Sequence, residues 1–387
     1  MFKIQTLNNI SEKGLELLPK DTYEISNDCA NPDGILVRSA KMHGMEFPPS
    51  LKAVARAGAG VNNIPIDECS EKGIVVFNTP GANANGVKEL VLTGLFLSSR
   101  KIVEGIQWTK SLKGKGDEVP KLVEKGKGEF AGPEILGKKL GVIGLGAIGV
   151  LVANAANALG MDVQGYDPYM SIDAAWGLSR DVHRAISLDS MLAECDYITI
   201  HVPLLDETKN MLNKEKFALM KKGVRILNFS RGELVNNTDL IEAIKAGIVA
   251  SYVTDFPSDE LIDVENIITI PHLGASTPES EDNCAVMAVE QLRNYLEHGN
   301  IKNSVNFPDC EMARTTNYRT VVAHRNIRNM VGQITTILAH ADINIMDMMN
   351  KSKKDWAYTI IDSDKKVEED IVAKIRAIDG VVSVRTL

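Results

Sequence analysis

A glycine-rich turn between two apolar segments limits the folds open to this chain more than any other feature. Residues 139–143 (Lys-Leu-Gly-Val-Ile) have the pattern of a buried strand, and three glycines follow them at the spacing of a dinucleotide-binding fingerprint. The first glycine permits a tight turn, the second lets the backbone approach a pyrophosphate, and the third lets the next helix pack closely. The residues predicted to contact a dinucleotide at this turn are Gly144, Gly146, Ala147, Ile148 and Gly149.

A second strand-like run, residues 162–166, ends at Asp167. A carboxylate at this place accepts hydrogen bonds from the adenosine ribose and repels a 2′-phosphate. The next residues, Pro168, Tyr169 and Met170, offer no arginine to receive such a phosphate. The pattern therefore favours NAD over NADP; the alternative reading of the turn is a strand-to-helix connection without a ligand.

Apolar strand-like runs alternate with helix-like segments along most of the chain, which predicts the α/β class with doubly wound parallel sheets. After about residue 317 the order of elements reads βαββαβ, a ferredoxin-like arrangement. We expect a substrate-binding domain at residues 1–98 and 276–306, an inserted Rossmann-like NAD-binding domain at 99–275, a linker at 307–317 and the ferredoxin-like domain at 318–387.

Composition excludes several classes of function. The formal net charge of -8 argues against general nucleic-acid binding, because phosphate backbones are held by clustered Lys and Arg. The five cysteines lie far apart, without the spacings of a metal site or a disulfide framework, so we expect reduced thiols and no metal. We find neither a signal-peptide pattern nor a long apolar stretch, and we expect a cytoplasmic protein without a membrane partner.

Three polar motifs each follow an apolar strand: residues 227–232, 255–260 and 271–277. Strand carboxyl ends converge on the ligand crevice of a doubly wound sheet, so Arg231 and His272 should face the nicotinamide. Oxidation of a 2-hydroxy acid needs a base for the hydroxyl proton and a cation for the carboxylate. Taken alone, the arginine could form a surface ion pair and the histidine could be a turn residue; the combination favours catalysis.

These motifs, with the glycine turn and residues 78–81 (Asn-Thr-Pro-Gly), resemble the D-isomer-specific 2-hydroxyacid dehydrogenases over nearly all of residues 1–300. The resemblance implies that Arg231 orients the substrate and that His272 is the acid/base, with an acidic partner. In many relatives the partner is a glutamate three residues after the phenylalanine, where this chain has Asp259. We expect Glu260 to be the partner because of its longer reach, with Asp259 as the alternative.

Residues 56–63 (Arg-Ala-Gly-Ala-Gly-Val-Asn-Asn) and 272–277 are similar to those of family members that oxidise 3-phospho-D-glycerate, which carries a carboxylate and a phosphate. An acidic protein must bring cations to such a ligand. Lys88 is a weak candidate, because several relatives have a small residue there. The expected substrate-binding residues are Arg38, Ser39, Arg56, Gly58, Ala59, Arg231 and His272. Further cofactor contacts are expected from Thr79, Asp167, Val202, Pro203, Phe229, Asp255, His272, Gly274 and Ala275.

The segment from Tyr318 onward resembles an ACT-type regulatory domain. In this family such a domain implies pairing of subunits and binding of the effector L-serine at the shared interface, through His324, Asn326 and Asn344. The chain departs from the usual Asn-x-Pro-Gly turn by carrying Arg328 and Asn329 there. The alternative is a dimerisation module without an effector.

The resemblance thus implies oxidation of 3-phospho-D-glycerate to 3-phosphooxypyruvate with NAD, the first step of phosphorylated L-serine biosynthesis, by a homodimer or homotetramer. Two other functions remain open. One is a dehydrogenase for an unphosphorylated 2-hydroxy acid, and the other is an NAD-sensing interaction protein. The presence of both Arg231 and His272 weighs against the second, and whether 2-oxoglutarate is also reduced stays open.

Overall fold

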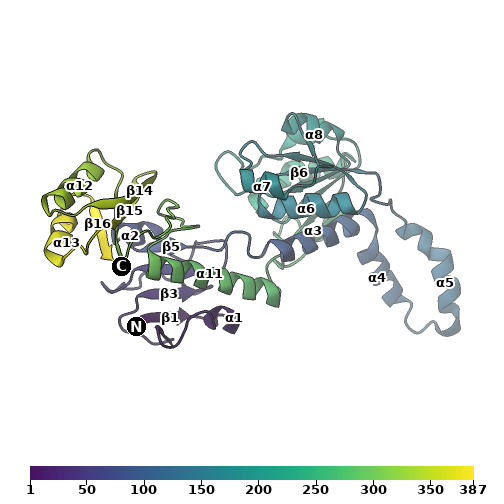
Figure 1. Ribbon diagram of the computed structural model, residues 1–387. Helices are drawn as coiled ribbons and strands as arrows, with labels where there is room; N and C mark the ends of the chain where they lie inside the picture. Colours follow the sequence, from purple (N-terminus) through teal and green to yellow (C-terminus); the bar gives the residue numbers. More distant parts are fainter. The chain divides into compact units, whose positions relative to one another are not determined.

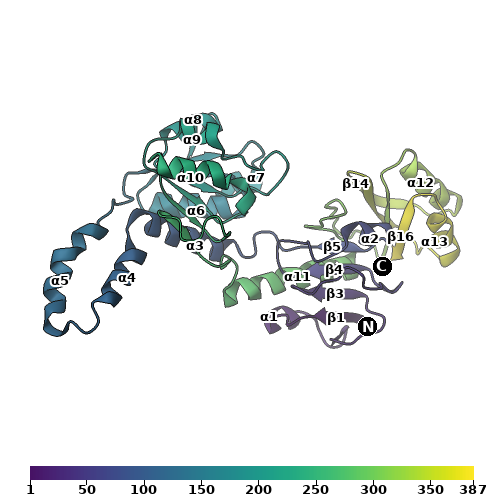
Figure 2. The ribbon, with the colours of Figure 1, turned by 180° about the vertical axis from the view of Figure 1, so that it is seen from behind.

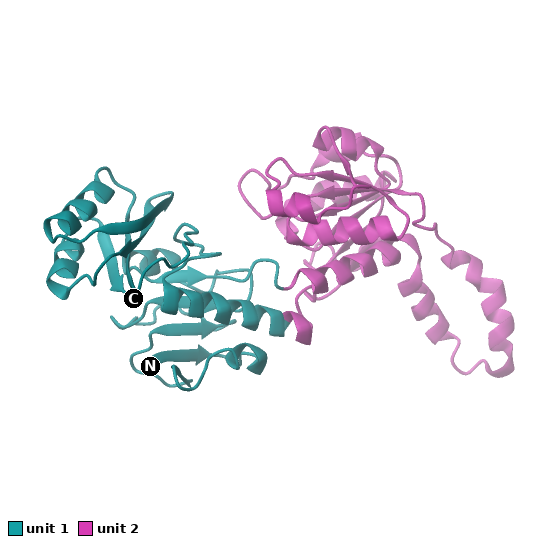
Figure 3. Cartoon of the chain, viewed as in Figure 1, with its two compact units in different colours: residues 1–82, 281–387 teal, residues 83–280 magenta.

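The computed structural model describes residues 1–387 and divides them into two compact units (Figure 3). The first unit comprises residues 1–82 and 281–387, and the second comprises residues 83–280. Each unit has its own parallel sheet, and the first carries an antiparallel sheet as well. The expected α/β class with doubly wound sheets is confirmed.

The first unit contains a five-stranded parallel sheet in the order β2-β1-β3-β4-β5. Its strands are β1 (Phe2–Leu7), β2 (Tyr23–Ser26), β3 (Gly34–Val37), β4 (Ala53–Arg56) and β5 (Val75–Phe77). Leu36 packs on one face with the long helix α11 (Pro278–His298), whereas Ile35 and Val37 pack on the other face near α2 (Ile66–Glu71). Burial of both faces explains why β3 is apolar throughout. The short helix α1 (Glu12–Leu15) follows β1.

The antiparallel sheet of the first unit is built from the C-terminal βαββαβ segment, in the order β14-β15-β13-β16. Its elements are β13 (Tyr318–Arg325), α12 (Met330–His340), β14 (Ile345–Lys353), β15 (Trp356–Ser363), α13 (Glu369–Arg376) and β16 (Val381–Thr386). Val322 packs in one core with the two helices, while its neighbours Val321 and Ala323 point to the opposite face and join the core around α11. The predicted order of elements is confirmed.

Residues 307–317 do not form the free linker that the sequence suggested. Phe307, Cys310 and Met312 are buried in the same core as Tyr295 of α11 and Tyr358 of β15. The apolar residues among Pro, Asp and Arg therefore anchor this segment between the parallel sheet and the antiparallel sheet. The expectation of a linker separating two domains is corrected to that of a packed connection within one unit.

The second unit contains a seven-stranded parallel sheet in the order β12-β11-β10-β9-β6-β7-β8. Its strands are β6 (Lys139–Ile143), β7 (Asp162–Tyr166), β8 (His183–Arg184), β9 (Tyr197–Ile200), β10 (Val224–Asn228), β11 (Val249–Thr254) and β12 (Ile267–Thr269). From β6 the chain builds outward through β7 and β8, and it then returns to the other side of β6 with β9. Ligands of doubly wound sheets bind at the carboxyl ends of the strands where this reversal occurs, here β6 and β9.

Helices cover both faces of this sheet (Figures 1 and 2). The helices of the unit are α3 (Ala84–Ser99), α4 (Ile102–Ser111), α5 (Val119–Gly126), α6 (Ala147–Ala158), α7 (Ile172–Gly177), α8 (Leu188–Glu194), α9 (Lys214–Leu219) and α10 (Asn237–Lys245). Three short 3-10 turns are η1 (Gly116–Glu118), η2 (Lys127–Phe130) and η3 (Gly232–Leu234). Helices α4 and α5 extend away from the sheet as a hairpin in both views. No helix of the chain combines the length and the apolar character needed to cross a membrane.

The unit boundaries differ from the expected ones at residues 98 and 275, because α3 belongs to the second unit. Its side chains Val87, Val91 and Leu95 lie in one core with Val142 of β6 and Leu227 of β10. The boundaries are corrected to 82/83 and 280/281.

Candidate active site

The glycine turn after β6 has a backbone that only glycine fits at its first position. Gly144 has a positive φ of 89°, and its N–H donates to the carbonyl of Tyr166 at 2.9 Å. A Cβ atom there would lie 2.6 Å from the carbonyl oxygen of His201, at the end of β9. The turn is therefore wedged between the ends of β7 and β9, at the point where the strand order reverses.

The other two glycines of the turn have opposite surroundings. A Cβ atom on Gly149 would collide with the carbonyl oxygen of Gly144, whereas one on Gly146 would meet no heavy atom within 4 Å. Gly146 is also the N-cap of α6. The chain thus keeps open space directly before a helix N-terminus, where a pyrophosphate is stabilised by backbone N–H groups. These residues fit the dinucleotide that the sequence predicted.

Asp167 braces the glycine turn from the end of β7. One carboxylate oxygen accepts from the backbone N–H of Leu145 at 2.8 Å, and the other accepts from that of Tyr169 at 2.8 Å. Each carboxylate oxygen can accept more than one hydrogen bond, so both keep capacity for ribose hydroxyls. Asp167 consequently connects the turn with the expected ribose position.

Arg231 and His272 lie on the same aromatic ring. The imidazole of His272 is 4.7 Å from the ring centroid of Phe256, and the guanidinium carbon of Arg231 is 6.0 Å from that centroid. Both polar side chains are exposed, and no side-chain hydrogen bond engages the His272 ring. Phe256 lies two residues after the end of β11, and Arg231 and His272 follow β10 and β12. The segments after these three strands therefore bring an exposed guanidinium and an exposed imidazole to one place.

Two buried polar residues, Asn228 and Thr254, fix this arrangement, and sequence reasoning missed both. The Asn228 amide donates to the carbonyl of Arg231 at 2.8 Å, and its oxygen accepts from the N–H of Ser230 at 3.2 Å. The Thr254 hydroxyl donates to the carbonyl of Asn228 at 2.8 Å and accepts from the N–H of Phe256 at 3.1 Å. Polar residues at the last positions of two buried strands were the available signal.

His201 is unsuited to acid/base catalysis, although it directly follows β9 beside the glycine turn. Its Nε2 shares a hydrogen bond with the Thr199 hydroxyl at 2.9 Å, and desolvation lowers its pKa to about 3. A histidine with such a pKa stays neutral at physiological pH. The imidazole available for proton transfer on this edge of the sheet is therefore His272.

Asp255 is the buried carboxyl group of the site, and its side chain is 1% exposed. Its Oδ2 accepts from the backbone N–H of Gly274 at 3.3 Å, while its Oδ1 has no hydrogen-bond partner. Burial raises the pKa of Asp255, and the charges of His272 and Arg231 oppose that rise. The pKa of Asp255 therefore depends on the charges of both candidate catalytic side chains.

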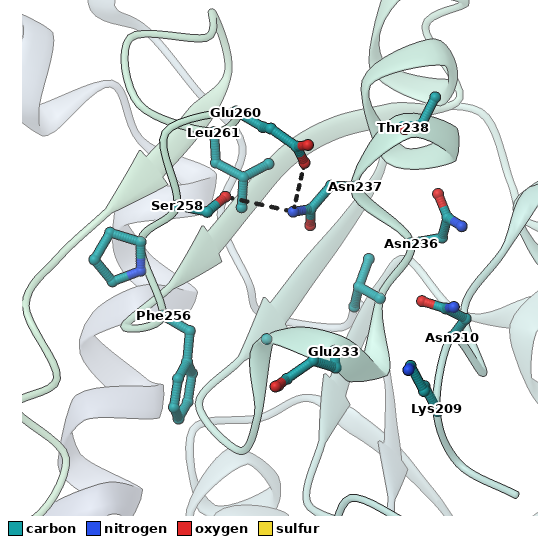
Figure 4. A pocket seen from close by; sticks show the side chains of 13 residues that line it. Lys209, Asn210, Glu233, Asn236, Asn237, Thr238, Phe256, Ser258, Glu260 and Leu261 are labelled. Atoms are coloured by element: carbon teal, nitrogen blue, oxygen red, sulfur yellow. Dashed lines mark hydrogen bonds between the residues drawn. The ribbon is translucent and has the colours of Figure 1, made fainter. Parts of the chain in front are cut away.

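Glu260 points toward α10. Its Oε2 accepts from the side-chain amide of Asn237 at 3.1 Å, and both residues line a cavity of about 500 Å³ together with Ser258 (Figure 4). No hydrogen bond or ion pair joins Glu260 or Asp259 to His272. The structure thus gives no contact in support of the predicted Glu260–His272 pair.

The remaining predicted cofactor residues have varied surroundings. Val202 is in contact range of the glycine turn, since a Cβ on Gly144 would lie 2.9 Å from its Cγ1. Phe229 is buried in the core against Gly94 of α3, which leaves little of its ring for a cofactor. Pro203 is exposed and Ala275 half-buried. Thr79 belongs to the first unit, where its N–H donates to the carbonyl of Gly58 at 3.2 Å.

In the first unit, Arg56 at the end of β4 is an incompletely paired cation. Its Nε is buried without a hydrogen-bond partner, no ion pair engages its guanidinium, and desolvation lowers its pKa. The guanidinium lies against Gly58, where a side chain would collide with it. Arg38, by contrast, forms an ion pair with Glu281 of α11 at 2.6 Å. A half-buried cation without a counter-ion is a candidate receptor for an anionic ligand.

The other predicted substrate-binding residues already have hydrogen-bond or ion-pair partners within the protein. The N–H of Ser39 donates to the side chain of Asn8 at 3.0 Å, and the carbonyl of Ala59 accepts from the Asn78 amide at 2.6 Å. These contacts order the loops after β3 and β4. Lys88 lies on α3 in the second unit and pairs with Glu89 at 3.7 Å.

The three predicted effector residues do not share one environment. His324 is buried, its Nδ1 bonding the carbonyl of Arg325 at 2.8 Å and its Nε2 the hydroxyl of Thr359 at 2.9 Å. Asn326 and Asn344 are exposed, and the Asn326 amide donates to the carbonyl of Lys354 at 3.0 Å. His324 is therefore fully engaged within the antiparallel sheet.

Comparison with known proteins gives the family of the second unit. Residues 92–274 match the model described as D-isomer specific 2-hydroxyacid dehydrogenase, NAD binding domain. A solved structure with similar architecture is the 3-phosphoglycerate dehydrogenase of Entamoeba histolytica with its cofactor NAD+ bound. It aligns with a TM-score of 0.60 and 26% identity, over 79% of this chain and 98% of that chain.

Curated relatives extend the similarity to most of the chain. A putative D-3-phosphoglycerate dehydrogenase of Schizosaccharomyces pombe is 30% identical, over 93% of this chain and 82% of that protein. The D-3-phosphoglycerate dehydrogenase of Archaeoglobus fulgidus is 31% identical over 87% of this chain, and that of Methanocaldococcus jannaschii is 32% identical over 84%. The matches span only 64% and 61% of those two proteins. The chain belongs to the D-isomer specific 2-hydroxyacid dehydrogenase family, and residues 92–274 are its NAD binding domain.

Proposed function

We propose that this protein oxidises 3-phospho-D-glycerate to 3-phosphooxypyruvate with NAD, the first step of phosphorylated L-serine biosynthesis. The observation that carries the proposed chemistry is the arrangement of Arg231 and His272 around Phe256, on the strand ends that also carry the glycine turn. The choice of phosphoglycerate is supported by the names of the relatives, which share 30–32% of their residues with the aligned part of the chain.

Two polar residues of the second unit, Arg231 and His272, have roles in the proposed reaction. One N–H of the Arg231 guanidinium donates to the carbonyl of Ser230 at 2.6 Å. Its other N–H donors remain available for a substrate carboxylate, which guanidinium groups bind in a bidentate manner. The unengaged imidazole of His272 takes the proton of the substrate hydroxyl. Bound NAD supplies the acceptor for the hydride that leaves the same carbon. In the reverse direction protonated His272 returns the proton.

Arg56 is the residue of the first unit that we assign to the substrate. Its guanidinium is partly desolvated already and lacks a counter-ion, so an arriving carboxylate or phosphate gains a charge-assisted hydrogen bond without displacing a protein partner. Arg38 would first have to give up Glu281. We therefore propose Arg56 as the main anion receptor of this unit and Arg38 as a secondary one.

We further propose that the βαββαβ segment is an ACT-type regulatory domain of a homodimer or homotetramer, with L-serine as feedback effector. The supporting observation is the order of its four antiparallel strands, β14-β15-β13-β16, with both helices on one face. Because His324 is engaged by Arg325 and Thr359, exposed Asn326 and Asn344 are the better placed of the three candidates for a first contact with serine.

The test is NAD-linked turnover of purified protein with 3-phospho-D-glycerate, D-glycerate, D-lactate and D-2-hydroxyglutarate, measured as NADH absorbance. We expect the highest kcat/KM with the phosphorylated acid and a decrease of that rate on addition of L-serine. Turnover of glycerate or lactate without turnover of phosphoglycerate would contradict the proposed substrate. Absence of any turnover, together with NAD binding in calorimetry, would favour an NAD-sensing protein.

A further inference from the structure

The antiparallel sheet of the first unit contacts helix α2, which follows the loop after Arg56. This loop, residues 57–65, is called the substrate loop below. At the far end of α2, the Glu71 carboxylate forms an ion pair with Arg325, the last residue of β13. We propose that Arg325 is a positioning residue of the substrate site: through Glu71 it holds α2, and so keeps the substrate loop ordered around Arg56. This inference rests on the proposed function, because Arg56 is the proposed anion receptor.

Helix α2 depends on distant segments of the chain for its stability. It has only six residues, and its N-cap, Pro65, provides no side-chain hydrogen bond to the helix. Helices this short are not stable alone in water. Glu71 lies in the last turn, which contains no basic residue, and a negative charge is unfavourable at that end of the helix dipole. Arg325 supplies the positive charge that the local sequence lacks.

Arg325 is itself held in place by its neighbours. Its guanidinium carbon lies 4.1 Å from the ring centroid of Trp356, and that ring packs on Phe307 at 5.5 Å. Its backbone N–H donates to the carbonyl of Gly380 at 2.7 Å, and its carbonyl bonds the Nδ1 of His324 at 2.8 Å. Most ion pairs at a protein surface lose side-chain entropy when they form. Arg325 is anchored by other contacts, so its pair with Glu71 has less of this cost.

A second contact joins the same end of α2 to the antiparallel sheet. Gly73 has a positive φ of 69°, and a Cβ atom there would lie 2.7 Å from the Cβ of Ser383 and 3.1 Å from the carbonyl oxygen of Val382. Both residues belong to β16, and helix α2 lies beside this strand in both views (Figures 1 and 2). The end of α2 is therefore fixed to the antiparallel sheet by an ion pair and by a close backbone contact.

The other end of α2 is continuous with the substrate loop. The loop ends at Pro65, the N-cap of the helix, so no residue separates the two. Gly58 and Gly60 of the loop both lie against Nη1 of Arg56. A shift of α2 therefore changes the backbone that surrounds this guanidinium. A ligand that moved residues 324–326 would act on the substrate site through the same contact.

Hydrogen exchange tests the positioning without substrate or cofactor. In Arg325→Gln we expect faster exchange of the substrate-loop amides, among them Ile64, because Glu71 is left unpaired at the negative end of α2. The double variant Arg325→Gln/Glu71→Gln removes that charge and should recover part of the protection. Arg325→Gln and the double variant both lose the contact with Trp356, so the recovery reports on the ion pair alone.

The same order should appear in the KM for 3-phospho-D-glycerate. In Arg325→Gln the substrate must order the loop when it binds, so we expect that KM to rise about two- to fivefold, the range of an exposed ion pair. The kcat and the KM for NAD should stay constant, because the glycine turn belongs to the second unit. A general loss of stability would instead lower the amount of active protein, and thus kcat, without changing either KM.

Arg385→Gln is the matched control. Arg385 also belongs to the antiparallel sheet and lies on an aromatic ring, that of Tyr295, at 4.6 Å, but it bonds the carbonyl of Leu296 in α11 at 2.8 Å. We expect its substitution to leave the exchange of the substrate-loop amides and the KM for 3-phospho-D-glycerate unchanged. Unchanged loop exchange in Arg325→Gln, or equal exchange in the single and double variants, would overturn the proposal. A folded wild-type protein without turnover of 3-phospho-D-glycerate would contradict the proposed function and leave the exchange experiment intact.

A reciprocal measurement on the wild-type protein covers the case in which Arg325→Gln does not fold. Coupling between two sites acts equally in both directions. Saturating 3-phospho-D-glycerate should therefore slow exchange of the Arg325 amide, which is bonded to Gly380. Equal exchange of this amide with and without the bound acid would refute the coupling.

Discussion

Arg319 and Asp362 form a bidentate ion pair in which neither side chain is exposed to solvent. The guanidinium Nε and Nη2 donate to the two carboxylate oxygens at 2.7 and 2.9 Å, and Nη1 donates to the carbonyls of His298 and Met312, each at 3.0 Å. The pair joins neighbouring strands β13 and β15 and ties both to the end of α11. The antiparallel sheet is thereby fixed to the parallel sheet's main helix within the first unit.

Removal of one member of this pair should be strongly destabilising, because the other charge stays buried without a partner. We expect Arg319→Met to lower the free energy of unfolding of this region by about 3–5 kcal/mol. Hydrogen exchange of the β13 and β15 amides measures the local effect. The double variant Arg319→Met/Asp362→Leu should recover part of the loss, since it leaves no buried charge. Equal protection in Arg319→Met and in the wild-type protein would show that the pair contributes nothing.

The same pair gives the C-terminal region an acid-sensitive stability. Burial would raise the pKa of Asp362, but hydrogen bonds from Arg319 and Thr315 outweigh it, and the pKa is lowered. A lowered folded-state pKa contributes stability that is present above the unfolded-state pKa, near 3.9, and is lost as the pH falls through the folded-state value. We expect protection of the β13 and β15 amides to decline below about pH 4 in the wild-type protein. In Asp362→Asn the protection should be lower at pH 7 and should lack this component of the decline.

Two of the three glycines of the cofactor turn, Gly146 and Gly149, provide a matched pair of substitutions. Gly149→Ala should destabilise the second unit before any ligand binds, because the new methyl group would collide with the carbonyl oxygen of Gly144. Gly146→Ala should leave the thermal midpoint nearly unchanged and weaken NAD binding by at least about tenfold, since the methyl group fills space that the free protein keeps open. Thermal unfolding and calorimetry measure the two effects. Normal NAD affinity in Gly146→Ala would contradict the assignment of that space to the pyrophosphate.

Asp167 should determine the choice between NAD and NADP. Asp167→Ala removes the acceptor of the ribose hydroxyls and the repulsion of a 2′-phosphate, so we expect the KM for NAD to rise about 10- to 100-fold. The KM for NADP should fall or stay constant. The substitution also frees the N–H groups of Leu145 and Tyr169, and Asp167→Asn, which can still accept a hydrogen bond, separates this local effect from the loss of charge. Equal changes in the KM for both cofactors would indicate damage to the turn alone.

Local sequence patterns predicted those parts of the fold and site that depend on neighbouring residues. The glycine turn, the strand ending at Asp167 and the βαββαβ order each arise from spacing within a few tens of residues, and the structure contains all of them. The boundary at residue 98 was misplaced because α3 packs on β6 and β10, which lie far along the sequence. Residues 307–317 looked like a linker because the cores that bury Phe307 and Cys310 come from distant segments.

In the candidate active site, too, local sequence patterns were predictive, whereas contacts between distant segments were not. Sequence position predicted Arg231 and His272 at the strand ends, where the structure places them, and the carboxyl partner of His272 stays a prediction. The contact of Glu260 with Asn237 and the burial of Asp255 beneath Gly274 both depend on how loops from different strands cross. Asn228 and Thr254, which hold these loops, were not predicted as site residues, although Asn228 lies within the motif at residues 227–232.

The contrast between Arg56 and Arg38 yields a prediction for the substrate end of the first unit. Arg56 lacks a counter-ion and is partly desolvated, whereas Arg38 is paired with Glu281. Arg56→Gln should raise the KM for 3-phospho-D-glycerate about 10- to 100-fold, the loss expected for a charge-assisted hydrogen bond. Arg38→Gln should raise it less, and Glu281→Gln, which frees Arg38, should lower it or leave it constant.

Steady-state kinetics of the three variants provide the comparison, with D-glycerate as a second substrate. A larger KM effect of Arg56→Gln on the phosphorylated acid than on D-glycerate would assign this guanidinium to the phosphate, and equal effects would assign it to the carboxylate. An unchanged KM for both acids would remove Arg56 from the substrate site.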